Sequence, residues 1–126
     1  MNRQAFTLAE IIVVIVIVAI IAAVAIPGFT KVVTKADKTQ AIAYLRNIRT
    51  AEKMYYGKWR TYLTLANSAA ILSGLDIETR LPSYAFSVTQ SGQTFSVAAS
   101  GPGGTLTLNE SGVWGGTNTP LPPGTD

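Results

Sequence analysis

The stretch FTLAEIIVVIVIVAIIAAVAIP, residues 6–27, decides the fold of this 126-residue chain. From Ile11 to Ile26 sixteen residues follow one another without a polar side chain. With the residues back to Phe6, the run reaches the length of roughly 20 residues that a helix needs to span a bilayer. Every backbone N–H and C=O inside lipid must be paired within its own segment, which favours a helix despite the many Val and Ile residues. Residues 6–30 are therefore predicted to form a transmembrane helix.

Two other interpretations compete for this run. A secretory signal peptide has a shorter apolar core, usually about 7–15 residues, followed by a small-residue cleavage site; here Pro27 is followed by Phe29 and a basic segment. The central helix of a soluble protein has a similar composition, but a chain of this length can hardly surround a helix that is apolar on every face. Burial in a membrane or in a bundle of helices fits the run better, and its Ala residues would let neighbouring helices approach closely.

Composition narrows the chemistry that the chain can perform. It has ten Lys and Arg residues against seven Asp and Glu, a net charge of +3, and neither His nor Cys. Ser-His-Asp and Cys-His nucleophile pairs, Cys/His zinc sites and disulfides are thereby excluded. Asp76 and Glu78 could belong to a calcium site, but calcium takes six to eight oxygen ligands, so an ordinary loop pair is the simpler interpretation. We predict no catalytic residue, metal or cofactor, and hence no enzyme.

Glu10 is the one acidic residue in the apolar stretch. A carboxylate near the end of a membrane helix is costly, so it either has a functional partner or lies at the interface in contact with water. The spacing alone leaves both interpretations open.

The string Ala5-Phe6-Thr7-Leu8-Ala9-Glu10, with a short polar leader before it and the apolar run after it, resembles the class III signal of type IV prepilins. Ala5 stands where Gly is usual in that signal, and Ala9 stands where Ile is usual. The resemblance implies that residues 1–5, which include Arg3, are a leader peptide. It also implies that a prepilin peptidase cleaves between Ala5 and Phe6, and that the new amino group of Phe6 is methylated.

For function, the resemblance implies a major pilin, the structural subunit of a type IV pilus. Such a precursor is held in the lipid of the bacterial inner membrane and joins a helical homopolymer, the cell-surface filament, with the help of the pilus assembly machinery. The assembly residues would be Phe6, Glu10 and Pro27: Glu10 would pair with the Phe6 amine of a neighbouring subunit in the filament core, and Pro27 matches the kink-forming Pro of the family.

Two alternatives to a major pilin stay open. A pseudopilin of a type II secretion or DNA-uptake system is built in the same way, although major pseudopilins carry an acidic calcium-binding loop that this sequence lacks. A membrane-anchored binding module would not polymerise at all. The residues do not choose between adhesion, twitching motility and DNA uptake. The charge distribution opposes a cytoplasmic N-terminus, because three Lys residues from 31 to 38 outnumber Arg3. The class III signal, in contrast, implies a cytoplasmic N-terminus.

Residues 31–126 are predicted to form a globular pilin domain. Its helix would run to about residue 58, with one buried stripe formed by Ala41, Tyr44, Leu45, Ile48, Ala51, Tyr55 and Trp59. A helix from Phe6 to Lys58 would be roughly 80 Å long, so its first half must project. A loop, residues 59–82 with one helical turn near Ala69–Leu72, should follow.

Segments in which apolar and polar residues alternate then predict an antiparallel sheet over about residues 84–114. A hairpin of 84–89 and 94–98 turns at Ser91-Gly92, a third strand covers 105–108, and Gly112–Trp114 gives a short fourth. The side chains expected to face the helix are Phe86, Val88, Phe95, Val97, Leu106 and Leu108. The tail from Gly115 to Asp126 is predicted to be irregular. The fold class is thus α+β: a long N-terminal helix, apolar and projecting in its first half, packed in its second half on a small sheet.

Two further groups of residues allow a binding function. Between Lys31 and Arg60 there are eight basic residues and two acidic ones, a local excess of +6. This stripe could attract DNA, or it could be a solvated face that pairs with acidic residues of neighbouring copies. The aromatic residues Tyr55, Tyr56, Trp59 and Tyr62 could form a stacking surface, but at the end of an amphipathic helix they are expected in the core.

Overall fold

The computed structural model describes residues 4–118. It divides into two units, the first ending at Lys35 and the second beginning at Ala36, and helix α1 (Leu8–Trp59) is continuous through the boundary. Both ends of α1 lie within two residues of the predicted ends. Pro27 lies inside the helix; it removes one backbone donor without ending the helix, as expected.

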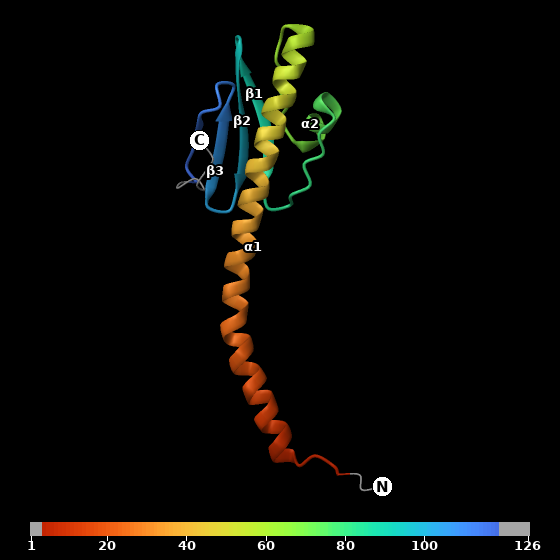
Figure 1. The fold of residues 1–126 in the computed structure, drawn as a ribbon, viewed down its shortest axis with the longest axis vertical. Coiled ribbons are helices and arrows are strands. Elements are labelled where there is room, and N and C mark those ends of the chain that lie inside the picture. The colour runs from red at the N-terminus through yellow and green to blue at the C-terminus, as the bar shows by residue number, and fades with distance from the viewer. Residues whose placement is uncertain (1–3, 119–126) are drawn as a thin grey trace. The chain divides into compact units, whose positions relative to one another are not determined.

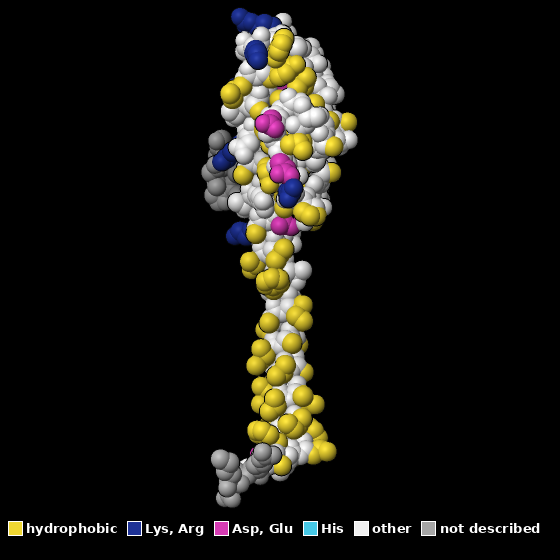
Figure 2. All heavy atoms as spheres, turned by 90° about the vertical axis from the view of Figure 1, so that its right-hand side faces the viewer, with side chains coloured by type: hydrophobic (Ala, Val, Ile, Leu, Met, Phe, Trp, Pro, Cys, Tyr) yellow, Lys and Arg dark blue, Asp and Glu magenta, His cyan; other side chains and the backbone are white. Residues whose placement is uncertain are grey.

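The first unit is almost entirely the apolar part of α1. Between Ile11 and Ile26 its large side chains are exposed, with exposed fractions from 47% at Ile12 to 75% at Val24. Figure 2 shows hydrophobic side chains gathered along the visible face of this unit. Since none of the most apolar stretch is buried within the chain, this surface must be covered by lipid or by other protein.

The second unit packs the rest of α1 on a four-stranded antiparallel sheet in the order β1-β2-β3-β4 (Figure 1). The strands are β1 (Ala85–Ser91), β2 (Thr94–Gly101), β3 (Gly104–Asn109) and β4 (Trp114–Gly116). Val88 pairs with Val97, and Val97 pairs with Leu108, so that one face collects the apolar side chains. All six residues predicted to face the helix are buried. The predicted α+β fold is confirmed.

Two elements differ from their prediction. β4 starts at Trp114, so Gly115 and Gly116, predicted as irregular tail, are in a strand. Thr117 and Asn118 are outside the strands, as predicted, and tail residues 119–126 lie outside the described residues. The turn before β4 uses residues up to Val113, whose backbone N–H donates to Asn109 Oδ1 at 2.8 Å. In the loop, the single predicted helical turn is a longer helix, α2 (Ser68–Leu75). Asn67 caps it by accepting a 2.9 Å hydrogen bond from the Ala70 N–H.

Two basic side chains tie the far edge of the sheet to α1. Lys38 Nζ donates to the backbone oxygen and to Oδ1 of Asn118, both at 3.1 Å. Arg49 donates to the carbonyl oxygens of Asn109 and Glu110 at 2.9–3.2 Å. These two members of the basic stripe therefore have structural roles inside the chain.

The buried stripe of α1 contains a carboxyl group that the sequence did not predict there. Ala41, Leu45, Ile48 and Glu52 are each 0% exposed, whereas Ala51, predicted in the stripe, is only half-buried. Glu52 Oε2 accepts a 3.0 Å hydrogen bond from the Leu63 N–H, and its Oε1 has no partner among the described residues. The Glu52 carboxyl thus binds the segment that follows α1, at Leu63, to the helix.

Glu52 should make stability depend on pH. Burial raises the pKa of this carboxyl above its ordinary value of 4.5, and the hydrogen bond from Leu63 opposes that shift only in part. Protonated Glu52 thus favours the folded state below pH 4.5, and this contribution is lost as pH rises through the raised pKa. In Glu52→Gln the amide oxygen still accepts the hydrogen bond from Leu63, so the free energy of unfolding should fall less than in the parent as pH rises above about 4.5.

Chemical denaturation of the detergent-solubilised chain, followed by the fluorescence of its two Trp residues, measures this difference. Glu78→Gln, at an exposed carboxyl, is the control and should follow the parent curve. If the free energy of unfolding changed with pH in the same way for Glu52→Gln and the parent, the predicted effect of burial on the Glu52 pKa would be contradicted.

Two glycines should respond to alanine in opposite directions. Gly116 in β4 has φ +107°, and a Cβ there would lie 2.0 Å from the Thr105 backbone oxygen; Gly116→Ala should break the β3–β4 pairing. Gly57 lies in α1, and a Cβ added there would meet no atom within 4 Å, so Gly57→Ala should raise the free energy of unfolding by about 0.5–1 kcal/mol. Thermal unfolding of both variants checks the pair, and equal shifts would contradict it.

Candidate assembly site at the start of the helix

Thr7 and Glu10 together begin helix α1. The Thr7 N–H donates to Glu10 Oε2 at 2.7 Å, and the Glu10 N–H donates to Thr7 Oγ1 at 3.2 Å. The Thr7 hydroxyl also donates to Glu10 Oε2, at 3.0 Å. This reciprocal pattern is a capping box, which pairs two of the backbone N–H groups that a helix start leaves free. The carboxylate is also favoured by the positive end of the helix dipole.

The capping box adds a third interpretation to the two that were open for Glu10. Its carboxylate has a partner within its own chain, at the residue three positions earlier. Sequence reasoning missed this contact, although Thr-x-x-Glu before an apolar run is a recognised signal for it. The orientation of the Glu10 carboxylate is thus fixed before any second molecule arrives.

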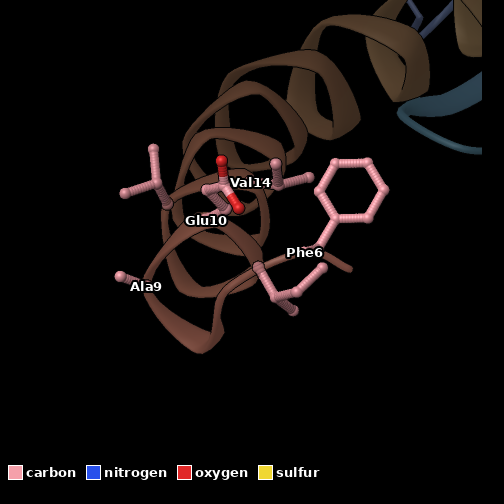
Figure 3. Close-up of a pocket in the computed structure, with 6 residues that line it drawn as sticks. Phe6, Ala9, Glu10 and Val14 are labelled. Atoms are coloured by element: carbon pink, nitrogen blue, oxygen red, sulfur yellow. The ribbon is translucent and has the colours of Figure 1, made fainter. Parts of the chain in front are cut away.

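A recess of about 620 Å³ lies beside this carboxylate. Its lining is apolar except for Glu10 and consists of Phe6, Ala9, Glu10, Ile11, Val13 and Val14 (Figure 3). In the view of Figure 3, Phe6 and Ala9 lie on opposite sides of Glu10. A cationic group that entered the recess would meet one oriented carboxylate in apolar surroundings, where charge-assisted hydrogen bonds are strong.

The structure brings together only some of the residues predicted to act in processing and assembly. Phe6 and Glu10 share the recess, and the Phe6 side chain is 80% exposed. Ala5 is exposed and lies before the helix, where the backbone is extended or irregular and accessible. Pro27 is part of the helix about 25 Å farther along and does not contribute to the recess. Residues 1–3 of the predicted leader lie outside the described residues.

The helix that carries this site is long and apolar enough to cross a membrane. Its most apolar window has a mean hydropathy of 3.2. Comparison with protein families matches residues 1–26 to the prokaryotic N-terminal methylation motif. Residues 1–26 are a prepilin signal. This prepilin signal is the one found in type IV pilins and pseudopilins, and it implies processing by a prepilin peptidase and assembly into a pilus-type structure.

The prepilin signal fits a chain anchored in the membrane before assembly, and proteins of this type are generally structural. The match ends at Ile26 and does not extend to the sheet. No curated protein and no solved structure matches the chain.

The other candidate sites have local structural roles. Asp76 caps the C-terminus of α2 in a left-handed conformation, and Glu78 pairs with Arg80. Across residues 4–118 no three acidic or His side chains are grouped closely enough to hold a metal ion. Of the four aromatic residues expected in the core, Tyr62 packs partly against it, but Trp59 is 59% exposed, so that expectation is wrong for Trp59.

Proposed function

We propose that this chain is the major pilin of a type IV pilus, a structural subunit without enzymatic activity. The prepilin signal at residues 1–26 carries the proposal. Residues 1–5 are then the leader, and cleavage between Ala5 and Phe6 leaves an N-methylated Phe6 at the start of the mature chain. Residues 6–30 are held in inner-membrane lipid before assembly and form the filament core afterwards.

The exposed apolar surface of α1 supports polymerisation with copies of the same chain. Moving this surface from lipid into a filament exchanges one apolar environment for another, so the hydrophobic effect contributes little to the step. Close packing must supply the attraction, and Ala19, Ala22, Ala23 and Ala25 provide the small side chains that allow it. Packing of such similar side chains specifies the register between neighbours only weakly.

Charge pairing can specify the register. The free amino group of Phe6 exists only after cleavage, and it is the cation that the Glu10 recess of a neighbouring subunit would receive. A bare carboxylate in the filament core would cost several kcal/mol, and an ammonium partner offsets that cost. Because the capping box already holds the Glu10 carboxylate in place, little conformational entropy is lost when the partner binds.

A pseudopilin of a secretion or uptake system carries the same prepilin signal and differs by forming only a short periplasmic rod. Electron microscopy of material sheared from the cell surface, labelled with antibody to this chain, separates the two functions. We expect long labelled fibres, and none from a strain that lacks the chain. Surface material without labelled fibres, while the chain is present and processed in the membrane, would reject the major-pilin assignment.

A further inference from the structure

A groove in the second unit lies between the last turns of α1 and helix α2. It has a volume of about 440 Å³ and is lined by Ala51, Met54, Tyr55, Lys58, Trp59, Gly74 and Leu75. Met54 is 72% exposed and Trp59 is 59% exposed. The rings of Tyr55 and Trp59 lie 6.3 Å apart. Met54, Tyr55 and Trp59 belong neither to the core around the sheet nor to the recess at Glu10.

The segment after the last described residue, 119–126, is rich in proline, and proline-rich segments bind in grooves of this kind. Residues 119–126 read TPLPPGTD, with three prolines within four positions. Proline-rich segments favour the extended polyproline II conformation and dock in grooves lined by aromatic side chains, at a low entropic cost. The charges also agree, because Asp126 ends this segment whereas Lys58 and Arg60 are exposed beside the groove.

The proline segment of a chain is too short to reach the groove of the same chain. Lys38 and the Thr105 carbonyl hold Asn118, and Pro123 is five residues farther on, at most about 18 Å away when fully extended. The groove residues of α1 begin at Ala51, thirteen residues beyond Lys38, which corresponds to about 20 Å along the helix.

The side of the groove that α2 forms is also separated from Asn118 across the sheet. Helix α2 packs against β1, whereas Asn118 follows β4, and three strand spacings separate these edges by about 14 Å. The axial separation of about 20 Å by itself exceeds the reach of about 18 Å, and the α2 side of the groove is farther away. An occupant with this sequence must therefore come from another copy.

We propose that residues 120–123 of one copy dock in the groove at Tyr55 and Trp59 of a second copy. The proposal deepens the proposed function, since it names a contact between globular domains in addition to the helix packing of the core. The groove of each subunit would receive the tail of a neighbour, so that the contact repeats along the polymer.

Disulfide crosslinking tests the contact directly, because the chain has no Cys of its own. Two differently tagged copies are expressed together, one with Met54→Cys and the other with Leu121→Cys. We expect a reducible mixed dimer in both sheared filaments and membranes. Adding Trp59→Ala to the Met54→Cys copy, or Pro122→Ala with Pro123→Ala to the other, should reduce the mixed dimer at least several-fold. Val113→Cys, at another exposed apolar position, replaces Met54→Cys in the control pair.

A mixed dimer no stronger than that of the control pair would overturn the proposal. So would a chain with both Met54→Cys and Leu121→Cys that crosslinks only within itself, because the short reach of the proline segment excludes that product. Trp59→Ala lies at the surface and leaves the buried core intact, so thermal unfolding of this variant should match that of the parent.

A second measurement separates this contact from the proposed function. A fluorescent peptide of residues 117–126 is titrated against the full chain in detergent, in a variant truncated after Asn118. We expect binding that Trp59→Ala weakens at least about tenfold. If filaments form but neither crosslink nor peptide binding is seen, this inference fails and the pilin function stands. If the peptide binds in this way but no filaments form, the pilin function fails and the contact stands. If neither is observed, both are rejected.

Discussion

Glu10→Gln is expected to leave membrane insertion and leader cleavage unchanged and to reduce the filament pool at least about tenfold. The amide oxygen can still accept the hydrogen bonds from Thr7, so the helix start is preserved. The neighbour's Phe6 ammonium, however, would be buried without a counter-charge, which costs about 3–5 kcal/mol. The ratio of filament to membrane pools, measured by immunoblot after shearing, gives the result.

Two matched variants refine this test of Glu10. Glu10→Asp keeps the charge with a shorter reach and should give an intermediate ratio. Thr7→Ser keeps the hydroxyl of the capping box and should behave as the parent does. Undiminished filaments from Glu10→Gln would mean that apolar packing alone sets the register, and the role proposed for Glu10 would be wrong.

Ala5→Leu is expected to abolish processing and, with it, filaments. The prepilin signal has a small residue before the cut, and Leu at this position adds a branched side chain where the peptidase must bind. In the uncleaved chain the Phe6 nitrogen is a peptide amide, so no ammonium is available to pair with Glu10. Nearly all of the chain should keep the precursor size on an immunoblot of membranes.

Ala5→Gly is the matched control for processing, since Gly is the usual residue at this position of the signal. It should be cleaved at least as completely as the parent. Filaments built from uncleaved Ala5→Leu chains would contradict the requirement for a free Phe6 amine.

Sequence patterns predicted the elements whose periodicity is strong. The uninterrupted apolar run and the amphipathic pattern after it together gave the helix nearly to its ends, and alternation in residues 84–108 placed three strands with their buried faces. Val88, Val97 and Leu108 pair across the sheet because each lies at the alternate position that faces α1. Periodicity of this kind is a property of the local sequence, so it can be recognised without knowledge of the tertiary contacts.

The contacts that were missed depend on single polar groups. Glu52 continues the spacing of Ala41, Leu45 and Ile48, but a carboxylate is normally exposed, and its burial depends on a hydrogen bond from Leu63, eleven residues away. The length of α2 depends on the Asn67 cap, and the start of β4 on the turn that Asn109 holds. At the candidate site, the family resemblance indicated Glu10 but not the capping box with Thr7.

Intact-mass measurement of the chain recovered from sheared filaments is the most direct test of the central claim, that a cleaved and methylated subunit polymerises through its apolar helix. We expect one dominant species that begins at Phe6, carries one methyl group and lacks residues 1–5. A filament species that retains Met1, or one cut near Ala25 and therefore without the apolar helix, would contradict the claim.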